Sequence, residues 1–320
     1  MVYIRTRLVE GRTYRYLSKS VRLRDGSVRS IQKLVKEDGI TADNLYGKYS
    51  DYFENAEARL HLDRILSMYG TDPIYTKQQV SKVEAMRTGY LRLLEKLSPA
   101  QRTDVFDRFV ANYTYDSNAL EGNSLTLKDV SMVLFEKKAA DGKDLREIYE
   151  TRNSRKVMDM ILDGRFRVRE KDIIRMHSLF MEDIDERRGY KILPNYLLGR
   201  DLELTPPEKV PDEMRKLIDW YEDSTKRMHP LKLSAHFHGR FLAIHPFEDG
   251  NGRVGRFLTN VMLLENGYPP IIIRKSWRTS YLKCLADNDR GYKTNLERFF
   301  LEKYKRTYED FFGVYLKYLK

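Results

Sequence analysis

Cysteine, proline, glycine and long apolar runs are all scarce in this sequence. The single cysteine, Cys284, excludes an internal disulfide and a zinc site built on cysteines. With 18 glycines and 10 prolines among 320 residues, a collagen-like or linker-dominated chain is excluded. No segment approaches the roughly 20 consecutive apolar residues that a membrane-spanning helix requires. Arginines and a glutamate in residues 1–12 stand where a signal peptide has its apolar stretch, so we expect a soluble, cytoplasmic protein.

Apolar and aromatic residues are abundant enough to form a large core. Hydrophobic residues make up 41% of the chain and aromatic residues 12%. This composition excludes wholesale disorder, because disordered chains contain few aromatic and few apolar residues. The length of 320 residues fits one large domain or two smaller ones.

Positive charge is concentrated near the N-terminus. The formal net charge is +11 at pH 7, and residues 1–40 contribute more than half of it, with ten basic and four acidic residues. Such a segment can bind the phosphates of a nucleic acid through the release of counterions. It can equally be a solvated face of a protein rich in Lys and Arg. No zinc finger, aromatic RNP motif or recognition-helix pattern accompanies it, so we favour the solvated face over nucleic-acid binding.

The hydrophobic pattern divides the chain into a short β-type part and a long helical part. Alternating apolar and polar residues at 3–9, 14–23 and 27–35 predict three strands, with Asp25-Gly26 in a hairpin turn between the last two. From about Thr41 the pattern has the helical period, and Ser98-Pro99-Ala100-Gln101 predicts the capped start of a new helix. We expect a basic β-meander appendage at 1–40, a helical linker region at 41–97 and a mainly α domain at 98–320.

The motif that carries chemistry is the segment at 245–256. It reads His-Pro-Phe-Glu-Asp-Gly-Asn-Gly-Arg-Val-Gly-Arg and joins two predicted helices, at 231–244 and 253–266. Its glycines permit a tight turn with bare amide groups, and the following helix start supplies unpaired N–H groups and a partial positive charge. This combination predicts a phosphate-binding site.

The side chains around that turn suit phosphate transfer. Arg253 and Arg256 lie three residues apart on the first helical turn and can hold further phosphate oxygens. Asp249 supplies a hard oxygen ligand for Mg²⁺ beside those phosphates. His245 can accept a proton from an attacking hydroxyl at neutral pH. The alternative is a glycine turn between two core helices, with His245 as a helix cap.

The pattern His245-Pro-Phe-x-Asp-Gly-Asn-Gly-Arg-x-x-Arg256 resembles, position for position, the signature of the Fic (filamentation induced by cAMP) family. Agreement at nine fixed positions argues against a chance match, and weaker similarity extends over about residues 110–300. The resemblance implies an all-helical core with a short β-hairpin flap. It also implies transfer of AMP from ATP to a hydroxyl side chain of a protein, with Mg²⁺ as cofactor and pyrophosphate leaving.

By position, the resemblance gives each residue of the motif a role. It implies that His245 is the general base and Asp249 the Mg²⁺ ligand. It implies that the phosphates are bound by an anion hole and two arginines, formed by Gly250, Asn251, Gly252, Arg253 and Arg256. We expect Phe247 to anchor the loop in the core and to take no part in the chemistry.

A second segment resembles the inhibitory motif of the same family. Residues 117–123 read Ser-Asn-Ala-Leu-Glu-Gly-Asn, in which Ser117, Glu121 and Gly122 match the pattern. The resemblance implies that Glu121 pairs with Arg256 and removes the cation that would orient the γ-phosphate, which misaligns the α-phosphate for attack. The alternative is a surface helix end, with Glu121 solvated and Gly122 as its cap.

A third segment, residues 189–204, resembles the β-hairpin flap of the family. Such a flap holds a target segment by adding a strand to it. Pro194 disturbs one of the two strands, which leaves the register of the hairpin open. The alternative is an ordinary helix–helix loop, although a loop of this length favours a functional role.

Two residues near the C-terminus resemble the part of the family's site that lies near the adenosine. They are Tyr281 and Asn288, with Asp289 competing for the second position. His236 and His238 lie close to the motif, but no glutamate completes an H-E-x-x-H zinc arrangement. We therefore do not expect these two histidines to bind metal.

Together these features predict an autoinhibited protein adenylyltransferase with His245 as general base and a Ser, Thr or Tyr hydroxyl of a target protein as acceptor. The protein itself is a further candidate target, and a homodimer remains open. One alternative is a de-AMPylase that uses the same site, with Glu121 positioning a water. Another is a binding module, in which residues 1–40 dock a nucleic acid or an acidic protein. We expect no membrane association.

Overall fold

The computed structural model describes residues 2–23, 25–138, 142–195 and 204–318. The chain forms two compact units, residues 1–88 and 89–320, and the boundary falls inside helix α3 (Lys77–Lys96). The architecture is mainly α with one small antiparallel sheet, which confirms the expected fold class. Among the helices of the described residues, none combines the length and apolar character that crossing a membrane demands. The domain boundaries expected near residues 40 and 97 stay predictions.

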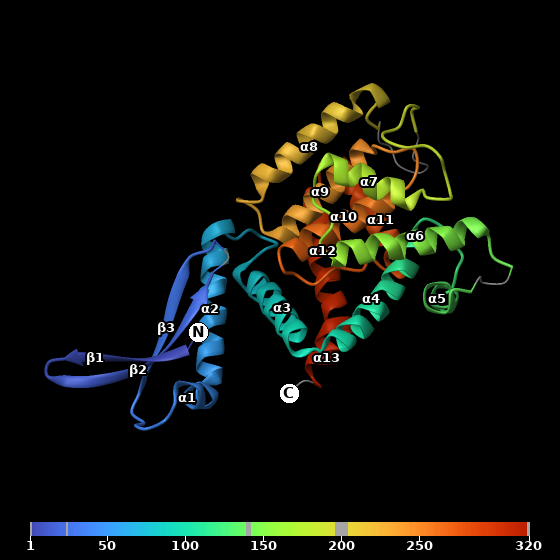
Figure 1. Ribbon diagram of the computed structural model, residues 1–320. Coiled ribbons are helices and arrows are strands. Elements are labelled where there is room, and N and C mark those ends of the chain that lie inside the picture. The colour runs from blue at the N-terminus through green and yellow to red at the C-terminus, as the bar shows by residue number, and fades with distance from the viewer. Residues whose placement is uncertain (1, 24, 139–141, 196–203, 319–320) are drawn as a thin grey trace. The chain divides into compact units, whose positions relative to one another are not determined.

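Unit 1 contains the expected three-stranded meander, drawn in blue in Figure 1. Strands β1 (Val2–Val9), β2 (Arg12–Arg22) and β3 (Val28–Val35) pair antiparallel in the order β1-β2-β3. Glu10 and Gly11 both have positive φ, 49° and 75°, which suits the tight turn between β1 and β2. Helices α1 (Ala42–Lys48) and α2 (Ser50–Tyr69) pack on one face of the sheet and bury Leu17 and Ile31 in a small separate core.

Unit 2 is helical. Its helices are α4 (Pro99–Leu120), α5 (Leu127–Ser131), α6 (Leu145–Leu162), α7 (Glu170–Phe180), α8 (Val210–Ser224), α9 (Pro230–Ile244), α10 (Asn251–Glu265), α11 (Arg278–Asp289), α12 (Lys293–Thr307) and α13 (Gly313–Leu316). Short π or 3-10 turns lie at Met132–Glu136, Pro207–Lys209, Lys275–Trp277 and Tyr308–Phe312. The capping box predicted at Ser98 is confirmed, because its Oγ accepts from the Gln101 amide and the Gln101 side chain accepts from the Ser98 amide.

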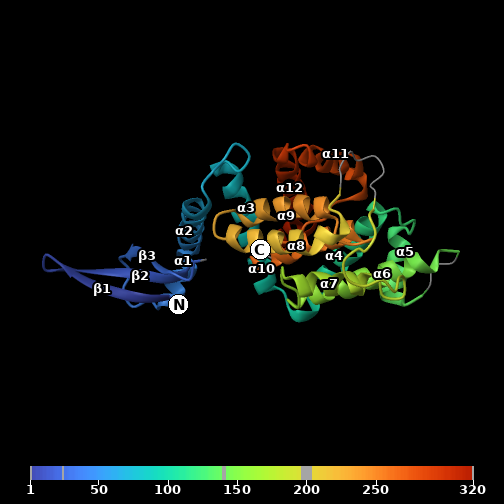
Figure 2. The ribbon, with the colours of Figure 1, turned by 90° about the horizontal axis from the view of Figure 1, so that it is seen from above.

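Helix α10 lies at the centre of unit 2, with α9 packed along it (Figures 1 and 2). Helices α4, α6 and α7 also contact α10, and α8 and α12 contact α9. The side chains of Val254, Phe257, Leu258 and Val261 on α10 are at most 2% exposed. Burial of such side chains stabilises a fold by ~1.5–3 kcal/mol each. The loop at 245–250 is therefore held at both ends by buried helices.

The segment expected to form the flap falls partly outside the described residues, since 196–203 are not among them. Residues 189–195 form bends and contain no strand. They lie against the loop at 245–250, because the amide of Lys191 donates to the carbonyl of Pro246 at 2.9 Å and the side chain of Asn195 donates to the carbonyl of Phe247 at 2.9 Å. The described part of this segment is thus fixed to the motif.

Candidate active site

The loop between α9 and α10 turns sharply at two residues with left-handed backbone. Helix α9 ends at Ile244 and is capped by His245, whose φ is 52° and whose amide donates to the carbonyl of Phe241 at 3.0 Å. Gly250 precedes α10 with a φ of 78°. A Cβ added at Gly250 would approach only the flexible end of Met181, so it is the left-handed conformation that requires glycine here. Helix α10 consequently starts at Asn251, two residues earlier than the sequence pattern predicts.

Asn251 closes this loop with its side chain. Its Oδ1 accepts from the amide of Phe247 at 2.9 Å, and its Nδ2 donates to the carbonyl of Phe247 at 2.7 Å. Phe247 is fully buried and stacks on His177 with 3.9 Å between ring centroids, which makes it the expected core anchor. Because its side chain is engaged within the loop, Asn251 has only its backbone N–H to offer an anion.

Arg256 and Glu121 meet directly over the first turn of α10. Arg256 is 3% exposed, and its Nη1 lies 2.8 Å from Glu121 Oε1 at the end of α4. Its Nε donates to Ser117 Oγ at 3.0 Å and its Nη2 to the carbonyl of Ser117 at 2.8 Å. Burial alone would lower the pKa of Arg256, but the charge of Glu121 and neighbouring tyrosines raise it above the ordinary value. The guanidinium is therefore a permanent cation held by the residues of the second motif.

Gly252 is the residue that lets the Glu121 carboxylate come so close. A Cβ added at Gly252 would overlap Glu121 Oε1 and lie 3.0 Å from Arg256 Nη1. The carboxylate thus occupies the space above the free amides at the start of α10, where an anion would bind. Gly122 follows with a φ of 104°, which lets the chain leave α4 immediately after Glu121. The alternative of a surface helix end with a fully solvated Glu121 therefore does not fit the structure.

Asp249 and Arg253 belong to a row of alternating charges that includes two residues of α6. Asp249 is 47% exposed, and its Oδ2 lies 2.6 Å from Arg146 Nη2. Arg253 is buried, with its Nη1 3.4 Å from Glu150 Oε1 and its Nη2 4.0 Å from Asp249 Oδ2. Asn123 donates to Glu150 Oε2 at 2.9 Å and ties the row to the segment after Glu121. No motif in the sequence pointed to Arg146 or Glu150.

The donors near Asp249 fit a metal ion that arrives with its substrate. The described residues contain no cluster of three His, Cys, Asp or Glu side chains that would hold a metal alone. A half-exposed carboxylate beside an anion site matches Mg²⁺, which keeps several waters and binds one or two carboxylates together with phosphate oxygens. Arg146 would have to leave Asp249 Oδ2 for such an ion to bind.

Two histidines near the loop differ in what they can do. His177 is 4% exposed, and burial lowers its pKa to about 4, so it stays neutral near pH 7. Its Nε2 lies 3.2 Å from the carbonyl oxygen of Asp249, so His177 supports the loop at 245–250. His245 is partly exposed at the C-terminal end of α9, so of the two histidines it is the one that a hydroxyl group of another molecule can reach.

Tyr281 and Asn288 both lie on α11. Tyr281 is 2% exposed, donates or accepts at 2.6 Å with His238 Nε2, and is close enough to influence the pKa of Arg256. Asn288 packs over α9, since a Cβ added at Gly239 would lie 2.8 Å from its Nδ2. His236 contacts Glu297 Oε1 at 2.8 Å, so His236 and His238 engage different partners.

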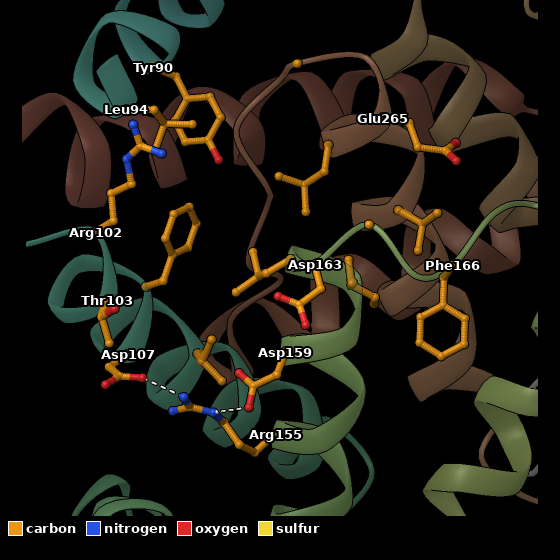
Figure 3. Close-up of a pocket in the computed structure, with 18 of the residues that line it drawn as sticks. Tyr90, Leu94, Arg102, Thr103, Asp107, Arg155, Asp159, Asp163, Phe166 and Glu265 are labelled. Atoms are coloured by element: carbon orange, nitrogen blue, oxygen red, sulfur yellow. Dashed lines mark hydrogen bonds and ion pairs between the residues drawn. The ribbon is translucent and has the colours of Figure 1, made fainter. Parts of the chain in front are cut away.

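A larger cavity lies elsewhere, at the far end of α10 (Figure 3). Its volume is about 950 Å³, and Val261, Leu264 and Glu265 contribute to its wall. Arg155 lies within it between Asp107 and Asp159, at 2.6 and 2.8 Å. A helix of the length of α10 spans roughly 20 Å, so this cavity is distinct from the anion site at Asn251. A smaller cavity of about 200 Å³ adjoins the loop beside His177 and Asp249.

Comparisons with known proteins agree with the motif. Residues 167–263 match the family model of the Fic/DOC family. A protein adenylyltransferase Fic of Drosophila willistoni is 28% identical over 219 residues, which are 67% of this chain and 44% of that protein. One of Drosophila erecta is 31% identical over 189 residues, which are 56% of this chain and 37% of that protein. The chain thus spans less than half the length of these curated relatives.

Solved structures of similar fold point the same way. A Fic domain containing signaling protein of Bacteroides thetaiotaomicron has a TM-score of 0.65 at 25% identity and covers 74% of this chain and 96% of its own. A Fic family protein of Desulfovibrio desulfuricans G20 has a TM-score of 0.62 at 26% identity and covers 77% and 78%. The likeness extends over about three quarters of the chain.

Proposed function

We propose that this chain, of which residues 167–263 match the Fic/DOC family model, is an autoinhibited protein adenylyltransferase. It transfers AMP from ATP to a Ser, Thr or Tyr hydroxyl of a target protein. The relatives named protein adenylyltransferase support the reaction class. The observation that carries the proposal is the contact of Glu121 with Arg256, 2.8 Å apart, directly above the start of helix α10, where an anion would bind.

The reaction forms one bond and breaks another at the α-phosphorus of ATP. The hydroxyl oxygen of the target bonds to the α-phosphorus, and the bond from that phosphorus to the bridging oxygen of the β-phosphate breaks, so that pyrophosphate leaves. His245 takes the hydroxyl proton as general base. The amides at Gly250, Asn251 and Gly252 bind phosphate oxygens, since they lie at a helix N-terminus and the space above Gly252 becomes free when the Glu121 carboxylate leaves.

The arginines hold the outer phosphates. Arg253 and Arg256 are buried, three positions apart, in the first two turns of α10, and a guanidinium group can bind two phosphate oxygens at once. Asp249 would hold Mg²⁺, which supplies charge neutralisation and orients the phosphate oxygens when bound. Arg146 would then leave Asp249 and pair with Glu150 alone.

Inhibition follows from competition for one guanidinium. While Glu121 occupies Arg256, the γ-phosphate lacks its cation and ATP adopts a pose in which the α-phosphate is not in line with the incoming hydroxyl. Release of Glu121 therefore activates the enzyme. The described start of the 189–204 segment lies against Pro246 and Phe247, which supports this segment as the place where a target approaches.

Intact-mass spectrometry of the Glu121→Gly variant after incubation with MgATP tests the proposal. We expect an adduct of one AMP on the variant itself or on proteins of a cell lysate, and at least tenfold less with the wild-type chain. Glu121→Gly combined with His245→Ala should form no adduct. Glu136→Gly, which removes an exposed glutamate paired with Lys138, is the matched control and should behave as wild type. A folded Glu121→Gly protein that neither binds ATP nor forms an adduct contradicts the proposal.

A second candidate function uses the same residues in the opposite direction. The Glu121 carboxylate is 41% exposed beside the anion site, so it can orient a water for hydrolytic removal of AMP from a modified protein. Free AMP released from a pre-modified target by the wild-type chain, and lost in Glu121→Gly, would identify this reaction.

A further inference from the structure

The register of the sheet in unit 1 sorts its side chains onto two different faces. Residues directly opposite each other in an antiparallel pair lie on the same face. Arg5 pairs with Tyr16, Arg7 with Tyr14, and Tyr3 with Ser18. Across the other edge of β2, Tyr16 pairs with Leu34 and Arg22 with Val28. We call this the open face; it carries Tyr3, Arg5, Arg7, Val9, Arg12, Tyr14, Tyr16, Ser18, Ser20, Arg22, Val28, Ser30, Gln32 and Leu34, of which Ser18 alone is buried.

The opposite face is covered by α1 and α2, and three of its basic side chains are engaged there. Lys19 Nζ lies 2.7 Å from Glu57 Oε2. Arg15 donates to the carbonyl of Glu37 at 2.6 Å. Lys33 Nζ stands over the rings of Tyr49 and Tyr52, at 4.7 and 4.4 Å from their centroids. On this face, contacts with the helices and the chain that follows the sheet engage these three side chains, and Arg29 stays exposed.

The open face has no such compensation. Arg5, Arg7, Arg12 and Arg22 are exposed, and among the described residues none of the four forms an ion pair. The strands place no acidic residue on this face, and Glu10 lies in the turn beyond its end. Asp25, the other nearby acid, is paired with Arg64 at 2.7 Å. Four exposed arginines without an acidic partner are therefore gathered on one surface.

Tyrosines alternate with these arginines. Tyr14 and Tyr16 are partly exposed on the central strand, and Tyr3 is 36% exposed on β1. The guanidinium of Arg7 lies 5.7 Å from the ring centroid of Tyr16, so cation and ring form one surface. Alternate residues of a strand are roughly 7 Å apart, about twice the 3.4 Å spacing of stacked bases in a duplex strand. Tyrosine rings about 7 Å apart can therefore stack on bases that are separated from one another, and not on bases stacked at about 3.4 Å in a duplex.

From this arrangement we propose that the open face of unit 1 binds single-stranded nucleic acid. Arginines without acidic partners bind backbone phosphates and release counterions, while tyrosine rings stack on the exposed faces of bases. A duplex hides those base faces. A second copy of the same surface would bring eight uncompensated arginines together, so charge disfavours face-to-face pairing of two chains. The inference is independent of AMP transfer, because every residue involved lies in unit 1.

Fluorescence anisotropy with the full chain tests the proposal, using labelled 12-mers of oligouridylate and oligothymidylate between 50 and 300 mM salt. If all four arginines contact phosphates, log Kobs falls with log salt with a slope of about −2.8, from roughly −0.7 per contact. Comparison of the RNA and DNA strands shows whether the 2′-hydroxyl contributes. No binding at 50 mM salt overturns the proposal.

Two double variants separate charge from stacking. Arg5→Ala/Arg7→Ala should reduce the steepness of the salt dependence by about 1.4, because two phosphate contacts are lost. Tyr14→Leu/Tyr16→Leu should leave the slope unchanged and weaken binding by about tenfold or more, because stacking is lost. Both changes are at exposed or partly exposed positions, and circular dichroism checks that the sheet persists.

A control of equal charge makes the result specific. Arg59→Ala/Lys77→Ala removes two exposed basic side chains of unit 1 outside the open face and should bind as wild type. Equal losses in this control and in Arg5→Ala/Arg7→Ala overturn the proposal, because they show attraction by net charge alone. So does equal affinity for a 12-base-pair duplex. An oligoglutamate peptide that displaces the strand at the same charge concentration also overturns it, in favour of an acidic protein partner.

Discussion

Glu121 Oε1 and Arg256 Nη1 lie 2.8 Å apart, although 135 positions of sequence separate the two residues. Arg256 is 3% exposed and Glu121 is 41% exposed, so the cation is built into the core while the anion stands at the edge of the solvent. Ser117 holds the same guanidinium through both its hydroxyl and its carbonyl. The cation therefore keeps its position when the carboxylate leaves. This asymmetry is what a removable inhibitor requires.

The competition between this carboxylate and a phosphate predicts a difference between two nucleotides. Glu121→Gln keeps the shape of the side chain and removes its charge. We expect MgATP to bind this variant about tenfold more tightly than it binds the wild type, since an uncontested charge-assisted contact is worth ~1.5 kcal/mol. MgADP lacks the γ-phosphate and should gain little. Titration calorimetry measures both, with Glu136→Gln as control; an equal gain for the two nucleotides would show that Glu121 does not compete for the γ-phosphate.

Gly252 offers a steric test of the anion site. Gly252→Ala places a methyl group where the Glu121 carboxylate now lies, 3.0 Å from Arg256 Nη1. In the Glu121→Gly background that space is free for phosphate, so the added methyl should reduce AMP transfer by about 100-fold, as loss of an anion-hole contact does. Gly47→Ala, with nothing within 4 Å of the added Cβ, is the matched control. Unchanged transfer in Gly252→Ala would place the phosphates elsewhere.

Local sequence sufficed for the parts of the site that lie within one short segment. The residues from His245 to Arg256 form a turn between two helices as the pattern predicts, because glycine at a left-handed position and a helix start are local features. The pattern gave no sign that the Asn251 side chain is engaged with Phe247, since an amide can bind either the loop or a ligand. Residue type alone does not decide that.

Contacts between segments that are distant along the chain could not be predicted from the sequence. Arg146 meets Asp249 across 103 positions, and His177 meets the same residue across 72. Exposed charges and buried histidines carry no periodic or spaced signature, so only the packing of α6 and α7 against α10 reveals these partners. The basic segment is a similar case. Counting charges located it, but strand register decides which arginines share a face with tyrosines.

Arg146 is expected to compete with Mg²⁺ for Asp249. Its ion pair at 2.6 Å is half exposed, and such pairs contribute ~0–1 kcal/mol. In the Glu121→Gly background, Arg146→Ala should therefore lower the Mg²⁺ concentration for half-maximal AMP transfer by up to about fivefold. Arg152→Ala, an exposed arginine on the same helix, serves as control. A higher Mg²⁺ requirement in Arg146→Ala would mean that the arginine assists the bound nucleotide instead.

The ion pair of Glu57 on α2 with Lys19 on the opposite face of the sheet predicts that the stability of unit 1 depends on acid pH. His61, 3.9 Å away, and Lys19, 2.7 Å away, hold the pKa of Glu57 at about 2, below the ordinary value of 4.5. As pH falls from 4.5 towards 2, Glu57 binds a proton in the unfolded chain but stays ionised in the folded chain. The stabilisation of the folded state by this carboxylate is therefore full above pH 4.5 and is lost progressively below it.

Glu57→Gln should therefore destabilise unit 1 at pH 7 by about 1–2 kcal/mol, allowing for solvent screening, and the difference from wild type should shrink towards zero near pH 2. Trp220 and Trp277 are the two tryptophans and both lie in unit 2, so fluorescence does not report on the sheet. Hydrogen exchange of the β2 amides, compared between variant and wild type at each pH, measures the effect where it arises. Asp63→Asn, an exposed acid on the same helix, should show no such difference. A gap between Glu57→Gln and wild type that is the same at pH 7 and at pH 2.5 would mean that the contact with Lys19 stabilises the sheet by shape and not by charge.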